Sequence, residues 1–131
     1  MIQLLLLTQN VETENKLTSI LDSENLTTTT TSVPSIDQAL SQMSQNQFDI
    51  VVFETAANGS NHLELLQILK MQHPSIPVLM LSLDSSRAGA IQAMRRNAHG
   101  YLTRERIGSE LADAVKTIQL GRCYMTTELT A

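Results

Sequence analysis

The chain has 131 residues, of which 42% are hydrophobic, 17% charged and 3% aromatic, with no tryptophan and a formal net charge of −4. This balance is typical of one globular domain with an aliphatic core, and it excludes a disordered chain or a base-stacking surface for single-stranded nucleic acid. The single cysteine, Cys123, excludes an internal disulfide, and the apolar start MIQLLLL is too short for a membrane span and lacks the features of a signal peptide, so we expect a cytoplasmic protein.

The first part of the chain predicts two strand–helix pairs. Residues 2–7 are an unbroken apolar run, which is typical of a strand buried on both faces of a parallel sheet, and Asn10 is placed to cap the helix that follows. The β-branched but polar run 26–33 predicts an edge strand, with a low-complexity linker as the alternative. Ser35 and Gln38 have capping-box spacing at the start of a second helix.

Three more strands alternate with three more helices in the rest of the chain. The strands are expected at 48–54, 76–83 and 98–103, and the helices at 62–73, 85–97 and 106–120, with Gly121 as a C-cap. Five strands alternating with five helices predict an α/β fold, a five-stranded parallel sheet with helices on both faces.

Polar residues stand where the predicted strands end. In a sheet of this kind, functional residues gather at the carboxyl ends of the central strands. Those positions are held by Thr8, Gln9, Glu54, Ser82 and Arg104. The three histidines are scattered without metal-ligand spacing, and neither a G-x-S-x-G elbow nor a glycine-rich phosphate loop is present, so we expect no catalytic residue, metal or cofactor.

Three segments give the chain a family resemblance: DIVVFE, PSIPVLMLS and the run from GAIQAMRRNAHGYLTRE to the end. With these segments the chain resembles a response-regulator receiver domain of the NarL/FixJ type, an atypical (degenerate) one. The resemblance implies a flavodoxin-like (βα)5 receiver fold over residues 1–122. It also implies that residues 123–131 begin a linker to a LuxR-type helix-turn-helix domain outside this chain.

The same resemblance implies roles for the residues at the strand ends. Receivers hold Mg²⁺ with an acidic pair and a phosphoacceptor aspartate, and a hydroxyl and a lysine contact the phosphoryl group. Thr8 and Gln9 stand at the acidic pair and Glu54 at the aspartate, while Ser82, Arg104 and Tyr101 match the hydroxyl, the lysine and the switch aromatic.

These departures predict a site without phosphoryl chemistry. Mg²⁺ normally takes one or two carboxylates, and Thr8 and Gln9 offer only neutral oxygens. We therefore expect a Glu54–Arg104 ion pair in place of both metal and phosphate, with Ser82 hydrogen-bonded to Glu54 and Tyr101 held inward. The alternatives are a solvated Glu54 with no role, and a receiver that is still phosphorylated at Glu54.

The basic residues gather late in the chain. Residues 87–131 hold six arginines and one lysine against four acidic residues, whereas residues 1–86 hold two lysines against nine. Such asymmetry can mark a partner-facing surface, although a solvated face is the ordinary alternative. The resemblance implies pairing with another receiver through the last two helices and the strand between them, or through the first and last helices. Arg87, Arg95, Arg96, Leu111 and Val115 are assigned to this dimer or partner surface.

The most economical hypothesis is therefore an atypical receiver of a transcriptional regulator. It would act through homodimers or heterodimers without phosphorylation, and it would reach DNA only through a domain outside this chain. A cyclic di-GMP sensor is the small-ligand alternative, because Tyr124, Met125 and Thr126 match part of a known motif, although Thr127 replaces its arginine.

Overall fold

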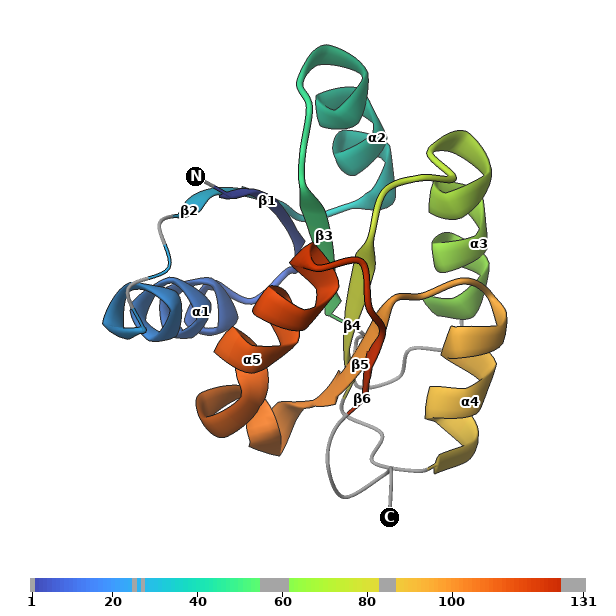
Figure 1. Cartoon of the computed structure of the whole chain (residues 1–131). Helices are drawn as coiled ribbons and strands as arrows, with labels where there is room; N and C mark the ends of the chain where they lie inside the picture. The colour runs from blue at the N-terminus through green and yellow to red at the C-terminus, as the bar shows by residue number, and fades with distance from the viewer. Residues whose placement is uncertain (1, 25, 27, 55–61, 83–86, 126–131) are drawn as a thin grey trace.

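Parallel strands form one sheet at the centre of the molecule (Figure 1). The computed structural model describes residues 2–24, 26, 28–54, 62–82 and 87–125. Within these residues the sheet has six strands in the order β2-β1-β3-β4-β5-β6. Their bounds are β1 (Ile2–Leu7), β2 (Thr28–Val33), β3 (Ile50–Glu54), β4 (Val78–Ser82), β5 (Gly100–Thr103) and β6 (Tyr124–Met125). The predicted edge position of the threonine-rich strand, β2, is confirmed.

Helices cover both faces of the sheet, as the alternating pattern predicts. They are α1 (Val11–Ser23), α2 (Ile36–Gln45), α3 (His62–Gln72), α4 (Arg87–Arg95) and α5 (Ile107–Gln119), with a short 3₁₀ turn, η1 (Arg104–Arg106), before α5. Figure 1 shows α1 and α5 together on one face and α3 and α4 on the other. The predicted α/β, flavodoxin-like fold is therefore confirmed. None of the described helices is long and apolar enough to cross a membrane.

The central strands are apolar on both faces because each face has its own core. Leu4 and Leu6 of β1 pack with the apolar residues of α1 and α5, whereas Leu5 and Leu7 pack with those of α2, α3 and α4. All four leucines are at most 4% exposed. The side-chain period of two along a strand divides an unbroken apolar run between two layers.

The helix ends follow the predicted capping chemistry. Asn10 Oδ1 accepts a hydrogen bond of 2.9 Å from the Glu12 N–H, and Ser35 Oγ accepts one of 3.3 Å from the Gln38 N–H. Gly121 has φ of 81° just after α5, where the Gly121 and Arg122 N–H groups donate to Ile118 and Thr117 carbonyls at 2.9 and 3.2 Å. This pair of bonds is a Schellman motif, and the predicted C-cap is confirmed.

The end of α4 has the same motif without a glycine. Asn97 adopts φ of 70°, its N–H donates to the Met94 carbonyl at 3.1 Å, and the Ala98 N–H donates to the Ala93 carbonyl at 3.2 Å. Asparagine tolerates this left-handed conformation better than most residues. The sequence pattern did not predict this cap.

The sixth strand, β6, differs from the five strands that the sequence predicts. Tyr124 and Met125 pair with Gly100 and Tyr101 of β5, and the Tyr124 N–H donates to the His99 carbonyl at 2.9 Å. Tyr124 packs on the core beneath α1 and α5, and Met125 packs on the opposite core. These two residues fall in the segment that the resemblance assigns to a linker, and they complete the sheet. The extent of that linker stays a prediction, since residues 126–131 lie outside the described part.

Candidate functional site

The carboxyl ends of the central strands bring the predicted polar residues to one edge of the sheet. Leu7 of β1 pairs with Phe53 of β3, so Thr8 and Glu54 follow side by side. Farther along the edge, Ser82 pairs with Thr103. Thr103 is 1% exposed and belongs to the same row, although the sequence reading did not include it among the site residues.

Glu54 is held by two threonine hydroxyls. Thr8 Oγ1 donates to Glu54 Oε1 at 2.5 Å, and Thr13 Oγ1 donates to Glu54 Oε2 at 2.6 Å. Both threonines are buried, at 8% and 4% exposure. Bonds of this length are typical of a hydroxyl that donates to an ionised carboxylate, and they are about twice as strong as bonds between neutral groups.

The two threonines come from different elements. Thr8 directly follows β1, and its Oγ1 also accepts a hydrogen bond of 3.0 Å from the Asn10 N–H. Thr13 is a buried residue in the first turn of α1, three positions after the Asn10 cap. Glu54 at the end of β3 therefore connects β1, α1 and β3 through side-chain bonds. Sequence reasoning missed Thr13, and the one available signal was a polar residue on the buried side of α1.

The other residue at the acidic-pair position faces away from this network. The Gln9 side chain is exposed, and its Nε2 donates to the Pro34 carbonyl at 3.4 Å. Thr8 is thus the residue of this pair for which the structure gives a hydrogen bond to Glu54.

The predicted Glu54–Arg104 ion pair stays a prediction. Arg104 begins η1, but its side chain lies outside the described part of the structure. Ser82 and Tyr101 are buried, at 2% and 1% exposure, and Tyr101 packs in the core beneath α2, α3 and α4. The predicted bond between Ser82 and Glu54 likewise stays a prediction.

The residues present do not fit a magnesium ion. Mg²⁺ requires oxygen acceptors in octahedral geometry, normally one or two carboxylates together with waters or phosphate oxygens. Here one carboxylate stands between two neutral hydroxyls that already donate to both of its oxygens. In the described part of the chain, no group of three or more His, Cys, Asp or Glu side chains could hold a metal ion.

The predicted partner surface is wrong for two of its residues. Leu111 and Val115 are 0% exposed and pack in the core beneath α1 and α5, because they belong to the apolar stripe that attaches α5 to the sheet. Arg95 is exposed and Arg96 partly so, as a surface requires, while the Arg87 side chain lies outside the described part.

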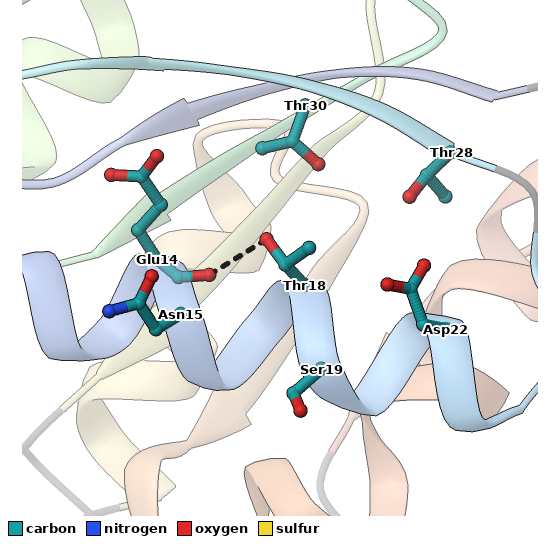
Figure 2. A pocket seen from close by; sticks show the side chains of 7 residues that line it. All are labelled: Glu14, Asn15, Thr18, Ser19, Asp22, Thr28 and Thr30. Carbon is teal, nitrogen blue, oxygen red and sulfur yellow. Dashed lines mark hydrogen bonds between the residues drawn. The ribbon is translucent and has the colours of Figure 1, made fainter.

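A polar depression, separate from the Glu54 site, lies between α1 and β2. Figure 2 shows its lining: Glu14, Asn15, Thr18, Ser19, Asp22, Thr28 and Thr30. It has a volume of about 490 Å³, and Thr18 Oγ1 donates to the Glu14 carbonyl at 2.9 Å. Its two carboxylates are eight positions apart along α1, which separates them by about 12 Å at 1.5 Å per residue. They cannot share one cation, so this depression offers no metal site.

The chain matches a known protein family over most of its length. The family described as "Response regulator receiver domain" matches residues 5–116. Among curated proteins, the glycerol metabolism activator of Pseudomonas putida is 27% identical over 95 residues, which cover 72% of this chain and 43% of that protein. The transcriptional regulatory protein LnrK of Bacillus subtilis is 29% identical over 94 residues, with the same two coverages. The chain thus spans less than half the length of these two relatives.

Solved structures share the fold at low sequence identity. The isolated REC domain of RcsB from Salmonella enterica serovar Typhimurium, in the apo form, superimposes with a TM-score of 0.87 at 9% identity, covering 99% of this chain and 96% of that one. A LuxR family DNA-binding response regulator from Silicibacter pomeroyi gives a TM-score of 0.84 at 17% identity, covering 98% and 99%.

Proposed function

Since this chain belongs to the family of response regulator receiver domains, we propose that it is an atypical receiver that signals without phosphorylation of the carboxylate at the end of β3. The observation that carries this proposal is the pair of hydrogen bonds from Thr8 and Thr13 to the two oxygens of Glu54. They occupy the group that would have to attack a phosphoryl donor.

Three physical features support the absence of phosphoryl transfer. The reaction needs a divalent cation or an equivalent charge to stabilise the negative charge that develops on the phosphoryl oxygens. Thr8 and Gln9 supply no carboxylate for such a cation, and Glu54 carries its carboxylate one methylene farther from the backbone than aspartate would. Each hydroxyl binds a different oxygen of Glu54, so whichever oxygen attacked would first have to lose a charge-assisted bond.

The same bonds suggest what the site does instead. Because these two bonds join β1, α1 and β3, they hold the carboxyl ends of the strands in one arrangement, in which Tyr101 is buried. In this proposal Glu54 is a fixed structural charge, and regulation comes from partner binding.

We propose that the chain acts as a homodimer or a heterodimer with another regulator. Of the two predicted pairing surfaces, we propose α1 with α5, because β6 pairs with Gly100 and Tyr101 on the β5 edge that the other surface would use. Val11 begins α1 at the carboxyl end of the strands and Leu120 follows α5 at the opposite end; they are 69% and 73% exposed and supply separate apolar contacts at the two ends of this face.

The output belongs to the rest of the protein in this proposal. The relatives are named as a metabolism activator and a transcriptional regulatory protein. By that likeness, a cytoplasmic transcriptional regulator would carry its DNA-binding domain outside this chain, and the receiver would position that domain through pairing.

The test compares the natural chain with a variant that restores the acidic residues. Beryllofluoride with Mg²⁺ should leave the amide NMR spectrum and the oligomeric state of the natural chain unchanged. The triple variant Thr8→Asp, Gln9→Asp, Glu54→Asp should respond, because it gains two carboxylates and shortens the third to the length of aspartate. A saturable response of the amides around Glu54 to beryllofluoride or to acetyl phosphate would contradict the proposal.

Calorimetry with cyclic di-GMP tests the small-ligand alternative. Its first two motif residues, Tyr124 and Met125, are paired with β5 and packed on the two cores, while Thr126 and Thr127 lie outside the described part. We expect no binding at Tyr124 and Met125, and a micromolar affinity that a substitution of Tyr124 abolishes would favour a ligand sensor over the proposed receiver.

A further inference from the structure

A basic groove lies between the C-terminal ends of α3 and α4. It is at the amino ends of the strands, whereas Glu54 is at their carboxyl ends. Its lining residues are Gln67, Lys70, Met71, Arg95, Arg96 and Asn97, and its volume is about 480 Å³. Both helices end here before the chain enters β4 and β5, so the groove is separated from the Glu54 site by the length of the strands. Figure 1 shows α3 and α4 as neighbours on the same face.

Three cations share this groove without a carboxylate among its lining residues. None of Lys70, Arg95 and Arg96 forms an ion pair within the described part of the chain. Each guanidinium carries five N–H donors and each ammonium three, and the hydrogen bonds observed here use only two of them. Lys70 Nζ donates to the Ile76 carbonyl at 2.7 Å, and Arg96 Nη1 donates to the Gln92 carbonyl at 3.4 Å.

Lys70 is unusual among these cations because it is only 7% exposed. Burial lowers the pKa of Lys70 below its ordinary value, since the protein replaces water around the ammonium without supplying an opposite charge. The helix C-terminal carbonyls provide partial negative charge to all three cations. A full anion would compensate them better, and the Arg95 side chain is exposed and that of Arg96 partly exposed.

We propose that this groove binds a small phosphorylated molecule with two or more negative charges. Guanidinium groups bind phosphate oxygens in pairs, and a lysine supplies a compact charge to the same group. The amides of Gln67 and Asn97 add neutral donors, and Met71, 75% exposed, offers an apolar surface to the organic part of the ligand. The volume falls within the range of about 300–1,000 Å³ for small-molecule sites. The proposed function does not depend on this site.

The experiment is an amide NMR titration of the ¹⁵N-labelled chain at physiological salt. The probes are inorganic pyrophosphate and, in a second arm, ADP. We expect saturable shifts at Gln67, Met71 and Asn97 with both probes, and tighter binding of ADP if Met71 contacts the organic part. Pyrophosphate binding equal to that of ADP would assign the site to inorganic phosphate chemistry alone.

Two variants make the result specific. Arg95→Gln with Arg96→Gln should weaken binding about tenfold or more, because each substitution removes a charged donor. Arg122→Gln removes an exposed arginine elsewhere and should leave the affinity unchanged. The proposal is overturned by an absence of saturable shifts, by an equal loss in Arg122→Gln, or by stronger binding of a glutamate-rich peptide than of either phosphate probe.

Discussion

The role of a carboxylate at a strand end depends on the groups that face it. A cation beside Glu54 would supply an opposite charge, whereas Thr8 and Thr13 supply hydroxyl donors to its two oxygens. For the proposed function, the threonine at position 8 therefore matters as much as the glutamate that stands at the aspartate position of receivers.

Thr13→Val should test the bond that the sequence did not predict. The change keeps the shape of the side chain and removes its hydroxyl, so we expect the free energy of unfolding to fall by about 1.5–3 kcal/mol, the range for a hydrogen bond to a charged group. Urea denaturation measures the difference. Thr13→Ser should retain most of the stability. A loss below about 0.5 kcal/mol, the ordinary range for surface changes, would show that the bond contributes little.

His99 makes stability depend on pH. Burial lowers the pKa of His99 below its ordinary value of 6.5, and the nearby charge of Lys70 lowers it further. Below pH 6.5 the unfolded chain therefore takes up a proton that the folded chain resists, and stability should fall as the pH drops toward the lowered pKa of His99.

Urea denaturation at pH 7.5 and at pH 5.5 measures this effect. His99→Gln should flatten the pH dependence, because the imidazole is removed while the backbone bonds of residue 99 remain. His73→Gln, at the end of α3, should keep the slope of the natural chain. If His99→Gln retained the full slope, other groups would have to account for it.

At the scale of elements, β6 is attached to the fold by backbone and side-chain bonds. Tyr124 Oη donates to Glu110 Oε1 of α5 at 2.5 Å, and Arg106 Nε lies 3.8 Å from Glu110 Oε2. The last strand is thus bound to β5 through its backbone and to α5 through its ring. Gly100 of β5 is one of the two residues that pair with β6. An added Cβ at Gly100 would come within 2.7 Å of Leu79 Cδ1 and 2.8 Å of Ile118 Cδ1, so this position has no room for a larger residue.

Tyr124→Phe should weaken this attachment. It removes the donor to a buried carboxylate and keeps the ring, so we expect a loss of about 1–2 kcal/mol in the free energy of unfolding. In a Glu110→Gln background the same change should cost less, and the difference between the two backgrounds gives the coupling energy of the pair. Equal costs in both backgrounds would mean that the bond is not energetically coupled.

Gly100→Ala tests how closely β5 packs. Both nearby side chains are buried in the core beneath α5, so they have little room to move, and we expect a loss of about 1–3 kcal/mol. Gly108→Ala is a suitable control, since an added Cβ there meets nothing within 4 Å. The thermal midpoints of the two variants should differ clearly, and equal midpoints would contradict this account of β5.

The elements that the sequence predicted are those with enough residues to show a period. The apolar run of β1 and the capping residues Asn10 and Ser35 carry their signals locally. A strand of two residues, β6, has no detectable period, and its pairing with β5 depends on a contact across the fold. Thr13 was missed for the same reason, because its partner Glu54 is 41 positions away.

Two residues that the family resemblance assigns to a partner surface are buried in the structure. Leu111 and Val115 have the helical spacing of a buried stripe, and the stripe packs on the sheet of the same chain. The spacing thus indicates burial, whereas the resemblance says nothing about exposure and led to the wrong surface assignment.

At the scale of the whole molecule, β6 decides which sheet edge is open. A chain that ends after Arg122 would expose the hydrogen-bonding groups of β5, and exposed edges of this kind pair with other chains. We expect such a chain to be less stable and to associate increasingly as its concentration rises. Analytical ultracentrifugation measures the association. A chain that ends after Met125 keeps β6 and should behave like the full chain; equal behaviour of both truncations would show that β6 does not protect the edge.

The placement of the tyrosines gives the molecule an optical signal of its own. Its two tyrosines, with no tryptophan to mask them, lie on neighbouring strands, Tyr101 in β5 and Tyr124 in β6. The phenol of Tyr124 donates to a carboxylate, an interaction that quenches tyrosine emission, and the phenol of Tyr101 is shielded from solvent. Detachment of β6 would therefore raise the intrinsic fluorescence, and the movement of this strand can be followed in the unlabelled protein.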